Sequence, residues 1–130
     1  LSNLERVLGE KSAKKKNKAS FKLTVEYLKS NEPVMVFPEG TRNDGKLKKA
    51  YTGIARLALA AKVPVLPCGI TGSNKVMPKG KTLPSLARCE VKIGKLMHFK
   101  KYRPNEKSYD EITRKIMKEI AKLINQEYTY

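Results

Sequence analysis

Two short apolar runs separated by a helical stripe limit the folds open to this chain. Residues 34–37 read Val-Met-Val-Phe between two prolines, which is typical of a strand buried on both faces. Residues 63–70 form a second apolar run, whose own two prolines favour an edge or irregular strand. Between the runs, apolar side chains recur on one helical face at Ile54, Leu57, Ala58 and Ala61. The order strand, helix, strand predicts an α/β fold with a right-handed parallel crossover.

Further patterns complete this expected parallel or mixed sheet with flanking helices. Helical spacing from Ser20, an available N-cap, predicts a short helix that ends near residues 30–31. Residues 72–84 are rich in Gly, Pro and Lys and are expected to form an exposed loop. Polar and apolar side chains alternate over residues 90–93, which predicts a half-exposed strand. A capping-box pattern at residues 108–111 predicts a final helix with an apolar stripe of Ile112, Ile116, Ile120 and Leu123.

The length of the chain predicts a single domain. A chain of 130 residues can bury a core without disulfide or metal cross-links. Residues 1–19 are rich in Lys, Ser and Asn, so we expect an irregular basic segment there and an α/β domain over residues 20–130. No apolar run approaches the roughly 20 residues that span a bilayer, so we expect a chain that is soluble or peripheral on a membrane.

The charge balance favours anionic partners. The chain carries 28 Lys and Arg against 12 Asp and Glu, a formal net charge of +16. Such an excess attracts nucleic acid, an anionic bilayer or phosphorylated substrates, and charge alone does not choose among them. The run Lys14–Lys16 is interpreted as a solvated arm in preference to a lipid-docking patch.

The sequence contains no pattern typical of a metal site or a redox site. Cys68 and Cys89 lie in apolar stretches without Cys-x-x-Cys spacing, and we interpret both as buried thiols. The single histidine, His98, is interpreted as an ordinary strand residue. No dinucleotide-type glycine pattern occurs, so we expect no bound metal or redox cofactor.

The segment after the first apolar run carries the residues for phosphate binding. Gly40 allows close backbone approach, Thr41 offers a hydroxyl donor, and Arg42 offers a planar fork of donors. The Glu39 carboxylate would repel an anion, so it either orients Arg42 or accepts a hydrogen bond from a substrate hydroxyl; the sequence leaves both roles open. A phosphate monoester suits this set, with steering by the nearby Lys46, Lys48 and Lys49.

Three ordered blocks resemble the glycerophospholipid acyltransferase family. They are Phe-Pro-Glu-Gly-Thr-Arg at 37–42, Gly-Ile-Ala-Arg-Leu-Ala at 53–58 and Val-Pro-Val-Leu-Pro at 63–67, within a resemblance that covers residues 20–99. The resemblance implies transfer of a fatty acyl group from acyl-CoA or acyl carrier protein to the hydroxyl of a glycerol-phosphate lipid precursor such as lysophosphatidic acid. It assigns binding of the acceptor phosphate to Glu39, Gly40, Thr41 and Arg42, with the acyl thioester as co-substrate and no further cofactor.

The sequence also departs from that family. The family's base is the His of a His-x-x-x-x-Asp motif, whereas His98 is followed five residues later by Arg103. Residues 9–15 match the family's second block poorly. We therefore expect an incomplete acyltransferase-type domain that supplies the acceptor phosphate site, is inactive in isolation, and lies peripherally on the cytoplasmic side of a membrane.

Two binding functions compete with the enzyme interpretation. A nucleic-acid module would pair basic with aromatic side chains, which Tyr102 and Arg103 satisfy only weakly, so no nucleic-acid partner is expected. A non-catalytic module for anionic lipid would have lost the histidine motif. Basic residues beside the C-terminal stripe also permit a membrane-surface helix, although core packing is the preferred interpretation of that stripe.

Overall fold

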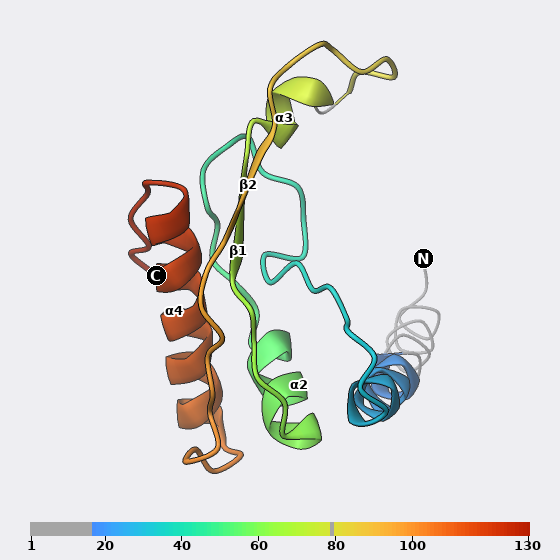
Figure 1. Cartoon of the computed structure of the whole chain (residues 1–130), viewed down its shortest axis with the longest axis vertical. Helices are drawn as coiled ribbons and strands as arrows, with labels where there is room; N and C mark the ends of the chain where they lie inside the picture. Colours follow the sequence, from blue (N-terminus) through green and yellow to red (C-terminus); the bar gives the residue numbers. More distant parts are fainter. Residues whose placement is uncertain (1–16, 79) are drawn as a thin grey trace, which may run out of the picture. The chain divides into compact units, whose positions relative to one another are not determined.

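The computed structural model describes residues 17–78 and 80–130. They form two compact units, one ending at Met35 and one comprising Val36–Tyr130 (Figure 1). The predicted boundary between an irregular segment and an α/β domain at residue 20 stays a prediction. Two predicted features lie outside the described residues: the Lys14–Lys16 arm and the block at residues 9–15.

The first unit, in its described part, is a helix over residues 17–29. Its end lies at Ser30, whose N–H donates back to the carbonyl oxygen of Tyr27 (3.0 Å). The predicted helix and its end are confirmed. Ser20 is not its N-cap, because the residues before it are already helical and its carbonyl oxygen accepts a hydrogen bond from the Thr24 hydroxyl (2.8 Å).

The second unit is a mixed α/β fragment with a small antiparallel sheet. Strand β1 (Cys68–Thr71) pairs with β2 (Glu90–Ile93), and the register places Cys68 opposite Ile93. The strand predicted at residues 90–93 is confirmed. The predicted parallel crossover between residues 34–37 and 63–70 is wrong, because residues 34–37 form no strand. β1 and β2, the only paired strands among the described residues, are antiparallel, so the expected parallel or mixed sheet is a small antiparallel one.

The second apolar run becomes a regular strand only after its prolines. Before β1, Val65 and Met97 exchange N–H···O bonds with each other (2.9 and 2.8 Å), forming one isolated bridge. Pro64 and Pro67 flank this bridge and lack the N–H that a ladder requires. The predicted irregular character is thus confirmed for residues 63–67, whereas residues 68–70 belong to the regular strand β1.

The first apolar run does not form the predicted buried strand. Residues 34–37 have neither helical nor strand structure. Met35 is 80% exposed and Phe37 is 65% exposed. A strand needs a neighbouring chain to satisfy its backbone, and no described segment pairs with this one. The apolar composition was correctly recognised, but pairing depends on a partner that local sequence does not specify.

The sheet has one covered face and one open face. Gly69 in β1 lies against the C-terminal end of the last helix, where an added Cβ would lie 2.6 Å from Ile124 Cγ2. Because successive side chains alternate, Cys68 falls on the other face and is exposed. Cys89, just before β2, is also exposed. The prediction of two buried thiols is therefore wrong. The open face also carries Ile70, Val91 and Ile93, each exposed.

The unit contains two longer helices that pack against each other, and the second of them also packs against β1. Helix α2 (Gly53–Ala61) forms where predicted and ends at Lys62, which takes a left-handed φ of 58°. Helix α4 (Glu106–Leu123) begins earlier than the predicted capping box. Asn105 caps it, since its side-chain oxygen accepts from the Ser108 N–H (2.8 Å), and Ser108 lies within the first turn.

The core lies between α2 and α4. Ile112 and Ile116 of the predicted stripe are fully buried and pack with Ala55 and Phe99. This confirms core packing as the role of the stripe. The guanidinium of Arg56 joins the two helices at the surface through both carboxylate oxygens of α4's Glu106 (2.7 and 2.8 Å). Over the described ranges, no helix combines the length and apolar character needed to cross a membrane.

Candidate functional site

The predicted phosphate residues begin a surface loop, residues 38–52, that precedes α2. The Glu39 side chain is half-buried within this 38–52 loop, and its carboxylate holds the loop together. Its oxygens accept hydrogen bonds from the Asn43 amide (3.1 and 2.9 Å) and from the Lys48 backbone N–H (2.7 Å). Glu39 thus closes the loop on itself, a role that differs from both of those predicted from the sequence.

Gly40 allows the tight turn at the start of the loop. Its φ is 65°, and its N–H donates to the Phe37 carbonyl oxygen (3.0 Å). An added Cβ would lie 3.1 Å from the Tyr51 ring. The Tyr51 N–H in turn donates to the Pro38 carbonyl oxygen (2.9 Å). These contacts place the turn beside the first residues of α2.

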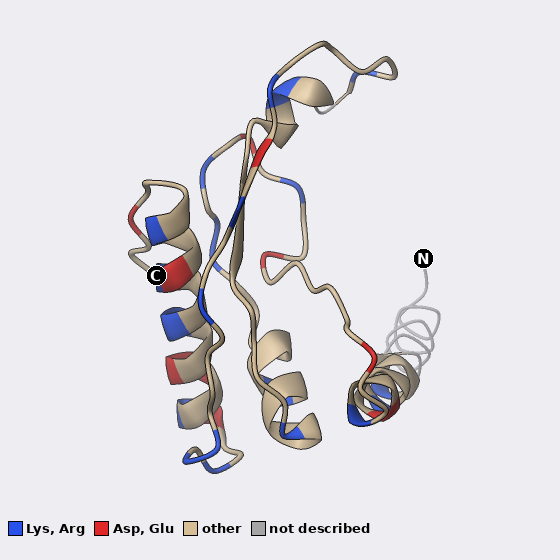
Figure 2. Cartoon of the chain, viewed as in Figure 1, with Lys and Arg blue, Asp and Glu red and all other residues tan. Residues whose placement is uncertain are grey.

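Thr41 and Arg42 are both exposed at the outside of the turn. The Arg42 carbonyl oxygen accepts from the Thr41 hydroxyl and from the Lys48 ammonium (3.4 Å each). The structure records neither a hydrogen bond nor an ion pair for the Arg42 guanidinium within residues 17–78 and 80–130. Further basic residues lie along the loop (Figure 2). The guanidinium donors of Arg42 therefore face solvent.

The chain's last residues fasten the other half of the loop. The Gln126 side chain accepts from the Leu47 N–H (3.1 Å) and donates to the Gly45 carbonyl oxygen (2.6 Å). The Tyr128 hydroxyl accepts from the Ala50 N–H (2.9 Å). No local pattern signalled these contacts, because they join residues about 80 positions apart. The loop is consequently held in shape before any ligand binds.

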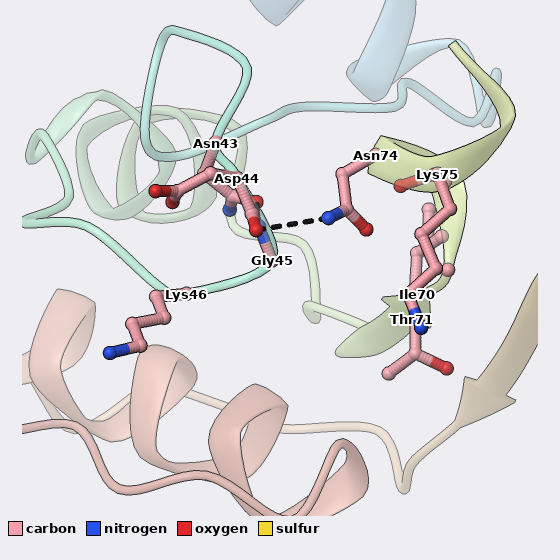
Figure 3. A pocket seen from close by; sticks show the side chains of 10 residues that line it. Asn43, Asp44, Gly45, Lys46, Ile70, Thr71, Asn74 and Lys75 are labelled. Carbon is pink, nitrogen blue, oxygen red and sulfur yellow. Dashed lines mark hydrogen bonds between the residues drawn. The ribbon is translucent and has the colours of Figure 1, made fainter. Parts of the chain in front are cut away.

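A shallow hollow lies beside the loop, next to α3 (Ser73–Val76). Its volume is about 310 Å³, and Figure 3 shows the Asn74 amide reaching the Asp44 carbonyl oxygen across it (2.9 Å). Lys46 and Lys75 also line the hollow. Glu39, Gly40, Thr41 and Arg42 are consecutive residues of one turn and lie outside this hollow.

The single histidine of the sequence lies in the segment after β2. His98 is exposed and follows the bridge residue Met97. In the described part of the chain, His, Cys, Asp and Glu side chains form no cluster able to hold a metal ion.

Shifted pKa values occur on the exposed surface of α4. The Tyr102 hydroxyl donates to the Glu111 carboxylate (2.7 Å) and, with Lys115, lowers the pKa of Glu111. Tyr102 and Glu111 raise the pKa of Lys115 in turn. The Lys115 ammonium lies 3.0 Å from the carboxylate, so the cluster is a surface ion pair along the helix.

Comparison with known proteins identifies relatives. The model of the acyltransferase family matches residues 1–71. The chain is 40% identical over 60 residues to the 1-acyl-sn-glycerol-3-phosphate acyltransferases BAT2 of Brassica napus and LPAT1 of Arabidopsis thaliana, both described as chloroplastic. Each match covers 45% of this chain and 17% of the relative, so the chain spans a small part of the length of these proteins.

A solved structure is similar as well. The crystal structure of the 1-acyl-sn-glycerophosphate (LPA) acyltransferase PlsC from Thermotoga maritima has a TM-score of 0.66 and 28% sequence identity. The similarity covers 79% of this chain and 45% of PlsC. The family match includes the 38–52 loop, α2 and β1. The chain belongs to the acyltransferase family and is related to its lysophosphatidic acid acyltransferases.

Proposed function

We propose that the 38–52 loop binds the phosphate of a glycerol-phosphate lipid acceptor, such as lysophosphatidic acid, for acyl transfer. The observation that carries this proposal is the exposed Arg42 guanidinium on a loop that is already fixed by Glu39. A planar guanidinium binds a phosphate through parallel, charge-assisted hydrogen bonds. The two chloroplastic relatives and PlsC are named for an acceptor that carries such a phosphate.

The orientation of Glu39 reduces the repulsion between its carboxylate and an anion bound at this turn. Its carboxylate accepts from Asn43 and from the Lys48 N–H, so its lone pairs are used inside the loop. Thr41 and Arg42 are exposed on the loop surface. The acceptor phosphate would contact Arg42 and the Thr41 hydroxyl, while Glu39 acts as a positioning residue for the turn.

The surroundings of the turn attract anions over a longer range. The sequence contains no Asp or Glu from Gly45 to Cys89. The start of α2 lies beside the turn and has no acidic residue in its first turn. A helix N-terminus carries a partial positive charge, which adds to the charge of the loop cations Lys46, Lys48 and Lys49. Both effects concentrate a phosphorylated lipid near Arg42.

Acyl transfer also requires a base that accepts the proton of the acceptor hydroxyl as it attacks the thioester carbon. The 130 residues contain no His-x-x-x-x-Asp, and His98 lies after β2, apart from the loop. We assign acceptor binding, and not proton transfer, to this chain, with acyl-CoA or acyl-loaded carrier protein as the donor. Incubation of the chain alone with labelled acyl-CoA and lysophosphatidic acid should give no acylated product; measurable product would contradict this division of roles.

The acceptor is a lipid, so the protein meets it at a membrane. We place the chain peripherally on the cytoplasmic side of an anionic membrane, supported by its net charge of +16. Lysophosphatidic acid, the acyl thioester and the bilayer surface are then its partners.

Titration calorimetry with short-chain lysophosphatidic acid tests the acceptor site. Arg42→Ala should weaken binding by roughly 10- to 100-fold, since a hydrogen bond to a charged group contributes about 1.5–3 kcal/mol. Arg103→Ala is the matched control, because it removes the same charge from an exposed residue just before the start of α4. The loop, in contrast, is fastened by residues that follow the end of α4. It should change binding by less than about threefold.

The phosphate itself is tested with the corresponding monoacylglycerol, which should not bind detectably. Equal losses in Arg42→Ala and Arg103→Ala would mean that net charge alone attracts the lipid. Unchanged binding in Arg42→Ala would remove Arg42 from the site.

A further inference from the structure

We propose that the described residues 77–78 and 80–89, the projecting segment, insert apolar side chains into the headgroup layer of an anionic bilayer. Leu86 is fully exposed, Leu83 is 79% exposed and Met77 is 43% exposed. Apolar side chains of this size usually lie in a core, so their joint exposure in one segment marks an interaction surface.

The projecting segment makes few internal contacts that would account for these leucines. Its described residues form neither helix nor strand. Its backbone is joined by the bonds Lys81 N–H to Pro78 O (3.2 Å) and Ser85 N–H to Val76 O (2.7 Å). Figure 1 shows it extending beyond α3, away from α2 and α4. The leucines therefore lie where another surface can reach them.

The charges around the leucines fit an anionic bilayer. Lys75 and Lys81 precede Leu83, and Arg88 follows Leu86. No acidic residue occurs between Gly45 and Cys89. Leucines flanked by cations are suited to an interface at which acyl chains lie beneath anionic headgroups.

Nucleic acid fits the same segment less well. Binding to single strands relies on aromatic platforms beside basic residues, and residues 77–89 contain no Phe, Tyr or Trp. Binding to a duplex is dominated by contacts to its phosphates, which Leu83 and Leu86 cannot make. The leucines thus favour a bilayer.

The position of the segment links it to the acceptor loop. It follows α3 directly, and Asn74 of α3 donates to the Asp44 carbonyl oxygen (2.9 Å). A bilayer that holds Leu83 and Leu86 would therefore lie near the end of the unit at which the 38–52 loop turns. A lipid acceptor in that bilayer would present its phosphate at the headgroup level.

This inference rests on the proposed function for the choice of partner only. Vesicles without lysophosphatidic acid test membrane insertion separately from acceptor binding. Membrane binding can fail while Arg42-dependent acceptor binding persists, and acceptor binding can fail while membrane binding persists.

Vesicle sedimentation measures the contribution of the leucines. The chain is mixed with phosphatidylglycerol–phosphatidylcholine vesicles and with phosphatidylcholine vesicles. The double variant Leu83→Ser and Leu86→Ser should lower partitioning onto the anionic vesicles about tenfold or more. Leu66→Ser and Leu96→Ser form the matched control, since these leucines are 47% and 56% exposed outside the segment. The control should partition like the original chain.

A tryptophan reporter measures insertion directly, because the sequence contains no Trp. Leu86→Trp should show blue-shifted emission on anionic vesicles and quenching by lipids brominated on their acyl chains. Leu96→Trp should show neither change. This arm depends on a single exposed substitution and so does not require the serine variants to fold.

Four outcomes would overturn the proposal: equal losses in the two serine pairs, equal spectra in the two tryptophan variants, equal partitioning onto neutral and anionic vesicles, and binding to duplex DNA that exceeds vesicle binding and ignores the leucines.

Discussion

The 38–52 loop and the projecting segment are both irregular, yet they are held in opposite ways. The first is fastened by its own Glu39 side chain and by the distant side chains of Gln126 and Tyr128. Local backbone bonds alone support the described part of the second. A loop fixed by its own polar groups can present Arg42 in one geometry, whereas a segment with exposed leucines is suited to a soft, nonspecific surface. The difference supports the proposals that the loop binds selectively and that the projecting segment docks on a membrane.

The largest expected effect tests whether the projecting segment is anchored at its base. Gly72, between β1 and α3, has a φ of 81°, and an added Cβ would overlap the Arg88 carbonyl oxygen. Gly72→Ala should lower the free energy of unfolding by roughly 2–4 kcal/mol, through backbone strain and this clash. Urea denaturation followed by circular dichroism measures it.

Gly80→Ala is the control for the backbone conformation. Gly80 has a φ of 86°, and nothing lies within 4 Å of its added Cβ. Gly80→Ala should lower the free energy of unfolding by about 1–2 kcal/mol. Equal losses at the two glycines would show that the base of the segment is as open as its tip.

The second expected effect tests the fixed loop. Glu39→Ala removes the acceptor for Asn43 and for the Lys48 N–H, which should cost about 1–3 kcal/mol of unfolding free energy. Asp44→Ala, an exposed carboxylate in the same loop, should change stability by less than about 0.5 kcal/mol. Chemical denaturation of both variants gives the comparison. If the two variants are equally stable, the loop does not depend on Glu39.

The smallest expected effect concerns the leucines of the projecting segment and their contribution to stability. Leu83→Ser with Leu86→Ser should leave the free energy of unfolding within about 0.5 kcal/mol of the original, because neither side chain is buried. Ile116→Val, which removes one methylene from a fully buried side chain, should cost about 0.5–1.5 kcal/mol and shows that the assay resolves such losses. A larger loss from the leucine pair would mean that these residues pack in the fold.

Local patterns predicted the elements that depend on local spacing. The stripe on α4, the helix α2 and the strand at residues 90–93 are all present. The start of α4 was misplaced because Asn105 competes with the capping-box pattern and takes the Ser108 N–H. The burial of Cys68 was wrong because an apolar run does not state which face of a strand the rest of the chain covers.

For the candidate site, the sequence proposed the residues, whose binding role stays a prediction, and tertiary structure decided what those residues contact. Gly40, Thr41 and Arg42 were recognisable because their chemistry and their resemblance to a family motif are properties of adjacent residues. The inward use of Glu39, the fastening by Gln126 and Tyr128, and the exposure of residues 34–37 depend on which distant groups meet. Hydrogen-bond partners and strand neighbours are non-local, so periodicity and motif specify what a segment can do, and only the assembled chain decides what it contacts.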